Sequence, residues 1–245
     1  MQQRRLFNIL DIVDSTNNYA MQKVHEGLAT HGEAWFAHAQ HAGRGQRGRA
    51  WSSQPGKNIH LSLVLRPIPH FFANPYAFSA LIAICCQQFI AQISTQNICI
   101  KWPNDLYWGD RKAGGILIEN NFSGSKWNWA VVGIGINVNQ MTFDGDASRA
   151  VSLKEISAKH MSPVSLAEQL HLHILAQYDT ITPESFKNII PQLNAVLYKK
   201  NEEVRLKKDG AAFLTRIKEV NEKGQLVTQD VMEHEFDFGS IEWVI

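Results

Sequence analysis

Apolar and polar positions follow different periods along this chain, and the changes of period divide it into predicted elements. Asn58–Leu65 alternates with a period of two, which predicts a strand. Phe78–Ile93 is long and largely apolar, which predicts a buried helix. Asp14-Ser15-Thr16-Asn17 precedes a helical pattern that runs to about Val24, so Ser15 or Thr16 is a candidate helix cap. By the same criteria we predict strands at Ala34–Ala39, Ile98–Trp102, Gly115–Glu119 and Trp129–Asn137, and helices at Leu166–Tyr178 and Glu184–Ile190.

The pattern changes near Val196, where the predicted elements become short strands separated by turn residues. These strands are expected at Glu203–Lys207, Phe213–Val220, Gln225–Thr228 and Glu235–Phe238. Closely spaced strands of this kind are typical of a small β-barrel. The sequence therefore predicts an α+β protein with a mixed sheet and helices in residues 1–195 and a small β-barrel in residues 196–245.

Composition places the chain among soluble globular proteins. It has 245 residues, 24 Lys and Arg against 23 Asp and Glu, and a net charge of +1. This balance gives no overall field that would attract nucleic acid or a membrane surface. No apolar run reaches the length of a membrane span, and the N-terminal residues lack the features of a signal peptide. The three cysteines, Cys85, Cys86 and Cys99, lack a metal-binding or disulfide spacing and indicate a reducing, cytoplasmic location.

Acidic residues are unevenly distributed. No Asp or Glu occurs in the 71 residues from Ala34 to Asn104, although this segment holds six Lys and Arg. Burial explains the absence of charge in the helix at Phe78–Ile93. It does not explain a purely basic loop, and we therefore expect an anion-binding site.

The sequence GRGQRGRAW, Gly43–Trp51, is the centre of that basic segment. Its glycines match the dinucleotide-binding spacing, but that motif requires a helix directly after the loop and an acidic residue about 20 positions later. Ser52-Ser53-Gln54-Pro55-Gly56 cannot begin such a helix, and no acid follows at that distance. We interpret the loop as one whose N–H and guanidinium groups bind an anion. Trp51 either stacks on a purine or belongs to the core.

A second dense segment is KWPNDLYWGDRKAGGILIE, Lys101–Glu119. Lysine suits a phosphate or carboxylate, and an adjacent Asp can bind Mg²⁺ or polarise a lysine. Considered singly, Lys112 and Asp110 also fit another interpretation, in which each is a residue of an exposed turn and not of a binding site.

Together these segments resemble the biotin protein ligase family. The chain is similar to that family in GRGQRGRAW, in KWPNDLYWGDRKAGGILIE, in the following VVGIGINVN, and in the flanking DSTN and GSIEWV. The resemblance implies a core related to class II tRNA synthetases, followed by an SH3-like barrel. It also implies an enzyme that converts biotin and MgATP to biotinoyl-5′-AMP and pyrophosphate. The biotinoyl group is then transferred to a lysine of a biotin carboxyl carrier protein, such as a subunit of acetyl-CoA carboxylase.

The resemblance also implies roles for individual residues. It implies that Lys112, Arg44 and Asp105 act in catalysis, with Asp105 as the candidate Mg²⁺ contact. The residues implied to bind biotin are Ser15, Thr16, Gln40, Gly43, Arg44, Lys112, Gly114, Gly115, Ile116, Gly133 and Gly135. The residues implied to bind the nucleotide are Arg44, Gly45, Gln46, Arg47, Trp51, Lys101, Asn104 and Asn137. The basic loop is expected to close over the adenylate and exclude water.

Two departures from the family pattern are visible. Many relatives carry Arg where this chain has Gln46, so one phosphate contact is missing or is made differently. Some bacterial relatives begin with a DNA-binding helix-turn-helix domain, for which the fourteen residues before Ser15 are too few. The resemblance therefore implies a ligase that does not bind DNA, and it leaves open whether the chain forms a homodimer.

Two other functions fit parts of the sequence. Lipoate–protein ligases share the fold and the adenylation chemistry, but the basic loop and the C-terminal strands favour biotin. A nucleic-acid-binding module could use the Arg-rich loop with Trp51, but it would need a broad basic face. The near-zero net charge argues against such a face.

Overall fold

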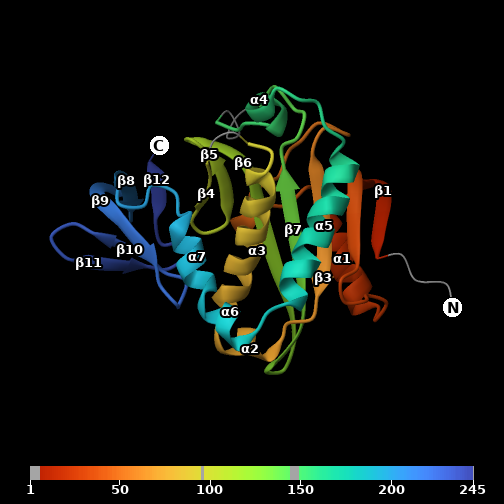
Figure 1. The fold of residues 1–245 in the computed structure, drawn as a ribbon, viewed down its shortest axis with the longest axis horizontal. Coiled ribbons are helices and arrows are strands. Elements are labelled where there is room, and N and C mark those ends of the chain that lie inside the picture. The colour runs from red at the N-terminus through yellow and green to blue at the C-terminus, as the bar shows by residue number, and fades with distance from the viewer. Residues whose placement is uncertain (1–5, 95–96, 144–148, 245) are drawn as a thin grey trace.

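The computed structural model describes residues 6–94, 97–143 and 149–244. Its larger sheet has seven strands in the order β1-β2-β3-β7-β6-β5-β4 (Figure 1). The pair β1–β2 is parallel and the other neighbouring pairs are antiparallel, so the predicted mixed sheet is confirmed. The strands are β1 (Phe7–Val13), β2 (Ala34–Gln40), β3 (Ile59–Leu65), β4 (Ile98–Lys101), β5 (Asp105–Trp108), β6 (Arg111–Ser123) and β7 (Lys126–Ile136).

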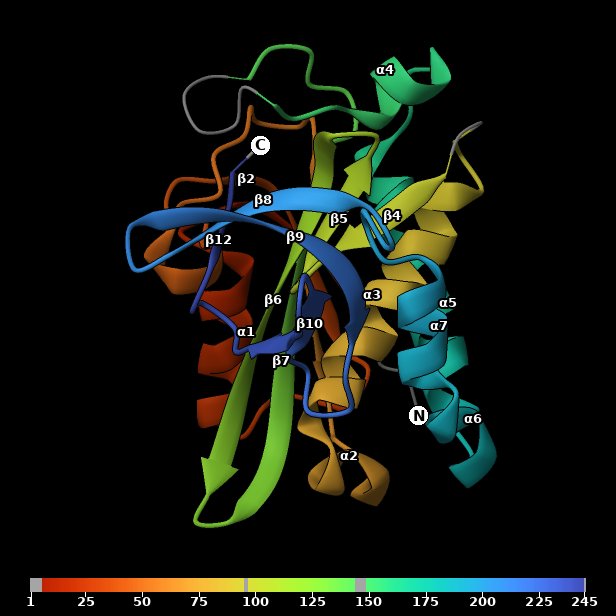
Figure 2. The same ribbon diagram turned by 90° about the vertical axis from the view of Figure 1, so that its left-hand side faces the viewer.

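Helices cover both faces of this sheet. On one face α3 packs against β4, and α5 packs against β3. On the other face α1 packs against β2, β3 and β7, and Figure 2 shows the sheet between α1 and the helices of the opposite face. The helices are α1 (Thr16–His25), α2 (Pro69–Ala73), α3 (Pro75–Ala91), α4 (Leu153–Ser157), α5 (Pro163–Asp179), α6 (Pro183–Lys187) and α7 (Ile189–Ala195).

The central elements follow directly from their apolar residues. Every residue of β3 is buried because helices cover both faces of the sheet there. The helix α3 starts at Pro75, which suits a first helical position because its missing N–H would have no partner in any case. The side chain of Asn74 accepts a hydrogen bond from Ala77 N and caps this helix.

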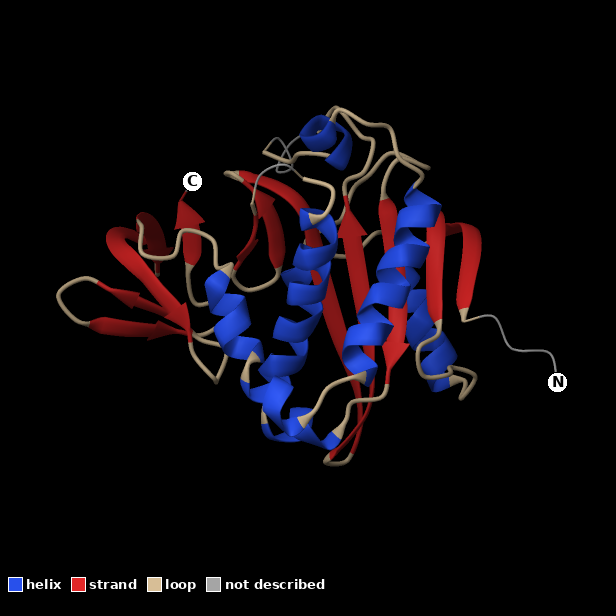
Figure 3. Ribbon diagram, viewed as in Figure 1, coloured by secondary structure: helices blue, strands red, loops and turns tan. Residues whose placement is uncertain are grey.

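The C-terminal residues form a second, five-stranded antiparallel sheet, as Figure 3 shows. Its strands run in the order β11-β10-β9-β8-β12. Their bounds are β8 (Glu203–Lys208), β9 (Ala211–Val220), β10 (Leu226–Gln229), β11 (Glu233–Phe236) and β12 (Glu242–Val244). The expected small β-barrel is not confirmed, because β11 and β12 lie at opposite edges of this sheet and do not pair with each other among the described residues.

This second sheet packs directly against the first. The indole Nε1 of Trp102, just after β4, donates to the carbonyl of Gly224 at 2.9 Å. The side-chain amide of Asn194 in α7 donates to Val220 O at 2.8 Å, and Val220 N donates back to Asn194 Oδ1 at 2.7 Å. Most of the buried apolar residues of the two sheets form one continuous core, and a smaller separate cluster lies between α1 and the larger sheet.

Most of the predicted elements are confirmed with small shifts of their ends. The helix predicted at Glu184–Ile190 is instead two helices, α6 and α7, which meet at Asn188. Ser15 is the residue before α1, but its side chain makes no capping hydrogen bond. The sequence patterns did not predict β1, β5, β12, α2 or α4. In the part of the chain that the structure describes, no helix has the length and apolar character needed to cross a membrane.

Candidate active site

A cavity of about 430 Å³ opens where α1 begins, beside the loop 43–51, the strands β6 and β7, and the C-terminal sheet. Its lining is strongly basic. The Lys and Arg residues that line it are Arg44, Arg47, Arg49, Lys101, Lys112 and Arg149, whereas its carboxylates are Asp105 and Glu242. A cavity with this excess of cations suits a ligand with several negative charges.

The start of α1 forms one end of the cavity and is held by the neighbouring strands. Gln40 Oε1, at the end of β2, accepts hydrogen bonds from Thr16 N at 2.7 Å and from Thr16 Oγ1 at 3.1 Å. Ser62 Oγ of β3 lies 2.8 Å from Thr16 Oγ1. Gln40 therefore provides the helix cap that Ser15 does not, and Ser15 and Thr16 are both buried at this end of the cavity.

Asn17 connects α1 to the floor of the cavity. Its Nδ2 donates to Glu119 Oε2 at 3.0 Å and to Leu117 O at 3.3 Å, while its Oδ1 accepts from Ser62 Oγ at 2.6 Å. A side chain on Gly133 would collide with the Asn17 amide. Glycine at position 133 therefore allows α1 to lie directly on β7.

The basic loop folds back on itself as a compact turn. Trp51 N donates to Gly43 O at 2.9 Å, and Gly45 N donates to Arg49 O at 2.7 Å. A three-residue 3₁₀ turn at Gln46–Gly48 forms its tip, in which Arg47 has a positive φ of 56°. The next regular element after the loop is the strand β3 and not a helix, in agreement with the rejection of a dinucleotide-binding motif.

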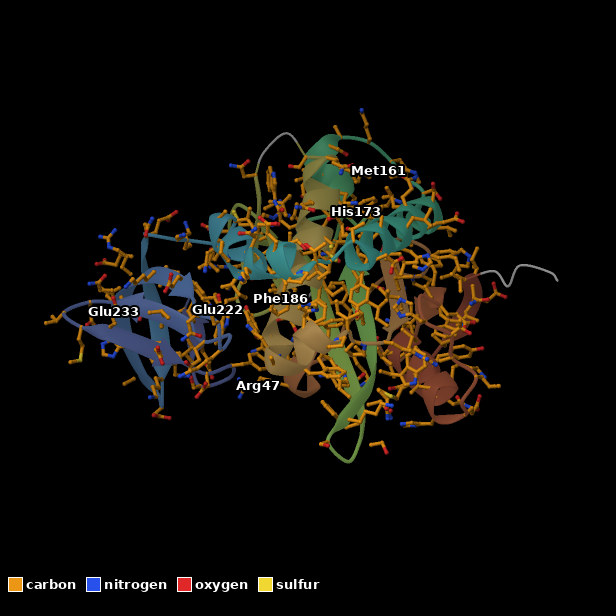
Figure 4. All side chains as sticks on the ribbon, turned by 60° about the horizontal axis from the view of Figure 1, so that its bottom comes forward. Arg47, Met161, His173, Phe186, Glu222 and Glu233 are labelled. Carbon is orange, nitrogen blue, oxygen red and sulfur yellow. The ribbon has the colours of Figure 1, made fainter. Side chains whose placement is uncertain are left out.

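The cations of this loop point in different directions. Arg44 forms an ion pair with Glu119 of β6, with Nη2 at 2.9 Å from Oε1. Arg47 lies against Gly239 in the turn between β11 and β12, where an added Cβ would be 3.1 Å from Cζ of Arg47. Figure 4 labels Arg47 on the side of the molecule near the C-terminal sheet. Neither guanidinium group is therefore oriented by the loop alone.

Gln46 points inward. Its Nε2 donates to Ile116 O at 3.3 Å, and its Oε1 is buried without a hydrogen-bond partner among the described residues. The Gln46 amide, which stands where many relatives have arginine, therefore does not face solvent. It leaves an acceptor for a ligand donor at the wall of the cavity.

Trp51 lies flat against the floor. An added Cβ on Gly135 would be 2.6 Å from Cε2 of the Trp51 ring, so only glycine allows this contact. Lys112 Nζ lies 5.7 Å from the centre of the same ring. Trp51 thus lines the cavity beside a cation and is not a residue of the main core.

Lys112 and Asp105 form the central charge pair of the cavity. Lys112 Nζ lies 2.6 Å from Asp105 Oδ1, and both side chains are partly exposed to the cavity. Gly115 leaves the space for them, because an added Cβ would be 3.2 Å from Asp105 Oδ1 and 3.3 Å from Lys112 Nζ. Lys112 lies in a strand, so the alternative of an exposed turn residue is wrong.

Asn104, Gly114 and Asn137 hold the strands around this pair. Asn104 Nδ2 donates to Ile116 O at 2.5 Å. Asn137 Nδ2 donates to Val151 O at 3.2 Å and to Lys112 O at 3.3 Å. An added Cβ on Gly114 would be 2.7 Å from the carbonyl oxygen of Gly135. Asn104 and Asn137 therefore fix neighbouring backbone segments around the pair, and Gly114 allows β6 to pack closely against β7.

Lys101 is the one buried cation of the lining, with 7% of its surface exposed. Its Nζ donates to the hydroxyl of Tyr107 at 3.2 Å. Burial lowers the pKa of Lys101 to about 8, and the carboxylate of Asp105 acts in the opposite direction.

Several residues of the lining were not found from the sequence. They are Asn17, His60, Tyr107, Phe143, Arg149, Phe238, Gly239, Glu242 and Trp243. His60 is held by Ser53 Oγ at 2.5 Å and by Ala37 O at 3.1 Å, and burial lowers its pKa. Asn17, Tyr107 and the C-terminal Gly239, Glu242 and Trp243 lie within sequences that resemble the family, but no role was expected of them individually. His60, Phe143, Arg149 and Phe238 lie outside every motif.

The described residues contain no group of three or more His, Cys, Asp or Glu side chains that could hold a metal ion by themselves. Asp105 is one of the two carboxylates that line the cavity, and it already binds Lys112. Mg²⁺ commonly uses one or two carboxylates together with waters and substrate phosphates. Asp105 therefore fits such an ion only when a phosphate is bound beside it.

Comparison with known proteins gives a consistent family. A model of the Biotin/lipoate A/B protein ligase family matches residues 9–137. The bifunctional ligase/repressor BirA of Escherichia coli is 37% identical over 130 residues, which are 53% of this chain and 40% of that protein. The biotin–acetyl-CoA-carboxylase ligase of Paracoccus denitrificans is 40% identical over 127 residues, which are 51% of each protein. The chain thus spans about half the length of the curated relatives that it matches.

A solved structure extends the similarity to the whole fold. The biotin protein ligase from Aquifex aeolicus, in complex with biotin and ATP, superposes with a TM-score of 0.79 at 27% identity. The match covers 97% of this chain and 98% of that chain, and it therefore includes the C-terminal sheet.

Proposed function

This chain belongs to the biotin/lipoate A/B protein ligase family, and we propose that it is a biotin protein ligase. It uses ATP to convert biotin to biotinoyl-5′-AMP with release of pyrophosphate. It then transfers the biotinoyl group to a lysine of a biotin carboxyl carrier protein. The similar proteins named as biotin ligases, and the similar structure with biotin and ATP, support this reaction.

The observation that carries the proposal is the Lys112–Asp105 pair in a cavity lined by six Lys and Arg residues. Adenylation brings the carboxylate of biotin against the α-phosphate of ATP, so negative charge accumulates at one point. Cations fixed in advance stabilise that charge as it develops in the transition state. Lys112 is suited to this task because Asp105 orients its ammonium and the Trp51 ring lies beside it.

We assign biotin to the end of the cavity where α1 begins. Buried hydroxyl and amide groups there can hydrogen-bond a neutral polar ring, while the glycines of β6 and β7 leave a flat floor. The assigned residues are Ser15, Thr16, Gln40, Gly43, Arg44, Lys112, Gly114, Gly115, Ile116, Gly133 and Gly135. In this assignment Arg44 acts by anchoring the loop to Glu119.

We assign the nucleotide to the part of the cavity beside Trp51 and the C-terminal sheet. The indole Nε1 of Trp51 is buried and has no acceptor among the described residues, so its edge is free to donate to a ligand. The assigned residues are Arg44, Gly45, Gln46, Arg47, Trp51, Lys101, Asn104 and Asn137. Asn104 and Asn137 act mainly by fixing the backbone, given their hydrogen bonds to carbonyl groups.

We propose Mg²⁺ as the metal ion, with Asp105 as its protein contact. When bound, the ion would neutralise phosphate charge and orient the phosphates for attack. Lys112 holds Asp105 in place for this contact.

The C-terminal unit is proposed to complete the nucleotide side of the site. We divide the chain at residues 195 and 196 into a catalytic domain and an SH3-like domain. The five short antiparallel strands support the SH3-like assignment, although the edge strands do not pair. Phe238, Gly239 and Trp243 from this unit line the cavity, which supports a direct part in binding.

The proposed location is the cytoplasm, where ATP and carrier proteins are present. Three free cysteines, two of them buried, suit a reducing compartment.

The transfer step tests the full proposal. The protein is incubated with MgATP, biotin and an apo carrier domain of acetyl-CoA carboxylase, and the carrier is analysed by mass spectrometry. We expect one biotinoyl group on one lysine. Lipoic acid in place of biotin is the control, and modification by lipoic acid at an equal rate would indicate a lipoate ligase instead.

A further inference from the structure

The ammonium group of Lys101 lies inside a cage of aromatic rings. Its Nζ is 4.6 Å from the centre of the Tyr107 ring, 5.0 Å from Trp243 and 5.7 Å from Tyr198. A cation within about 6 Å of a ring face is attracted by the ring quadrupole, and the attraction is stronger when water is excluded. Lys101 is buried, so these rings replace much of its lost hydration.

The rings come from three separate parts of the fold. Tyr107 belongs to β5, next to the strand of Lys101. Tyr198 lies between α7 and β8, and its position is fixed by a hydrogen bond from its hydroxyl to Asp110 Oδ1 at 2.8 Å. Trp243 belongs to β12, an edge strand of the C-terminal sheet, where it pairs with Leu206 of β8. The C-terminal sheet therefore supplies one wall of the cage.

The charge of Lys101 is not neutralised by a neighbouring carboxylate. No salt bridge to Lys101 is found among the described residues, and Asp105, which faces it across β4 and β5, binds Lys112 instead. Lys112 and Arg149 add positive charge nearby. The cage thus keeps an unpaired cation at the wall of the cavity, which is the arrangement expected for a group that meets an anionic ligand.

We propose that Trp243 is a positioning residue for nucleotide binding: it holds the ammonium of Lys101 toward the phosphates and thereby makes the affinity for ATP depend on the C-terminal sheet. The inference rests on the proposed function for the identity of the anion. It also identifies Trp243 as the residue through which the C-terminal sheet affects nucleotide binding. Biotin, whose neutral ring is assigned to the opposite end of the cavity where α1 begins, should be affected much less.

The test is a double-mutant cycle in the full-length protein. Trp243→Leu removes the ring but keeps apolar volume, Trp243→Phe keeps a ring, and Lys101→Met removes the cation. We expect Trp243→Leu to raise KM for ATP about tenfold, on the scale of a desolvated cation–π contact. KM for biotin should change less than about twofold, and Trp243→Phe should restore most of the affinity. In the Lys101→Met background, Trp243→Leu should add less than about twofold, because the two residues act as a unit.

Trp129→Leu is the matched control, since Trp129 also stacks on a cation, Arg66 at 4.5 Å, but does not line the cavity. It should leave KM for ATP unchanged. An equal effect of Trp243→Leu with and without Lys101 would show that Trp243 only packs the two sheets together and would overturn the inference. So would an unchanged KM in Trp243→Leu.

The same variants separate this inference from the proposed function. ATP affinity is also measured directly by titration calorimetry without biotin. If the wild-type protein binds ATP but shows no biotin-dependent reaction, the proposed function fails, while the cycle of ATP dissociation constants still decides the role of Trp243. If the wild-type protein neither binds ATP alone nor shows a biotin-dependent reaction with it, both are wrong.

Discussion

Arg44 binds Glu119 through both terminal nitrogens of its guanidinium group, with Nη1 at 3.1 Å from Oε2 and Nη2 at 2.9 Å from Oε1. Arg44 Nη1 also donates to Asn18 Oδ1 of α1 at 2.8 Å. The first arginine of the basic loop thus anchors the loop to β6 and α1. The loop is in this way held over the cavity from its beginning.

Loss of this anchor should loosen the loop. Glu119→Gln removes one charge of the pair and keeps the shape of the side chain. Because the pair is partly exposed, its contribution is about 1 kcal/mol, and we expect KM for biotin to rise about fivefold. Trypsin should also cleave faster after Arg47 and Arg49. Glu155→Gln, which breaks the Arg111 pair at 3.0 Å, is the control and should change neither quantity. Unaltered trypsin cleavage in Glu119→Gln would show that the pair does not hold the loop.

Lys112 should be essential for adenylation. Lys112→Ala removes the cation next to Asp105, and we expect the rate of biotin-dependent pyrophosphate exchange to fall at least about 100-fold, as when other transition-state donors are removed. Circular dichroism and the melting temperature should stay close to those of the wild type. Lys126→Ala, at the exposed start of β7, is the matched control with unchanged exchange. Exchange near the wild-type rate in Lys112→Ala would remove Lys112 from the mechanism.

Gly135 should affect ATP binding because it leaves space for the Trp51 ring. In Gly135→Ala the new methyl group would overlap the Trp51 ring, which lies 2.6 Å from the position of that Cβ. The displaced ring should raise KM for ATP by roughly five- to tenfold, the scale of one lost stacking contact. In a Trp51→Ala background the same substitution should have little effect, because no ring remains to be displaced. A similar rise in both backgrounds would locate the damage in the sheet and not in the ring.

Gln46 and Arg47 should set the lifetime of the adenylate. Gln46 reaches the wall of the cavity without a charge, so Gln46→Arg should slow dissociation of biotinoyl-5′-AMP, since a charge-assisted hydrogen bond is about twice as strong as a neutral one. Arg47 lies against Gly239, so Arg47→Ala should weaken the contact of the loop with the C-terminal sheet and speed dissociation. It should also increase labelling of lysines on bystander proteins. Equal off-rates in the wild type and both variants would show that neither side chain senses the adenylate.

ATP use should decline in mildly alkaline solution. Burial lowers the pKa of Lys101 from 10.5 to about 8, so its ammonium is present below that pH and is lost above it. The value of kcat/KM for ATP reports ionisations of the free enzyme, and it should therefore fall as the pH rises through about 8. Lys101→Arg keeps its charge at all of these pH values, so its profile should stay level. A wild-type profile as level as that of Lys101→Arg would show that Lys101 does not titrate there.

Helices and strands were predicted correctly where their own apolar and polar residues follow a regular pattern. The alternation at Asn58–Leu65 and the apolar run at Phe78–Ile93 correspond to β3 and α3. In β3 alternate apolar residues belong to the main core, whereas His60 and Ser62 between them are buried and hydrogen-bonded to Ser53 and Thr16. By contrast β1 was missed, since apolar and polar residues do not alternate in its sequence FNILDIV and the apolar Ile9 and Ile12 are exposed. The strands β5 and β12 are too short to show a period.

The site was predictable only where its residues are close in sequence. The motifs at 43–51 and 101–119 contain most of the cavity cations. The contacts between motifs were not predictable, because they depend on the register of strands far apart in the chain. Arg44–Glu119, Asn17–Gly133 and the Trp243 wall of the Lys101 cage all arise in this way. The C-terminal strands were found, but not their open arrangement, since local patterns do not say which edge strands pair.

Exchange of labelled pyrophosphate into ATP tests the central claim most directly, because it reports reversible adenylation of the carboxylate without any carrier protein. The wild-type protein is assayed with MgATP and labelled pyrophosphate, with biotin, with lipoic acid and without either acid. We predict exchange that depends on biotin and is absent in the other two mixtures. Exchange that is equal with and without biotin, or exchange with lipoic acid alone, would contradict the assignment of this cavity to biotin adenylation.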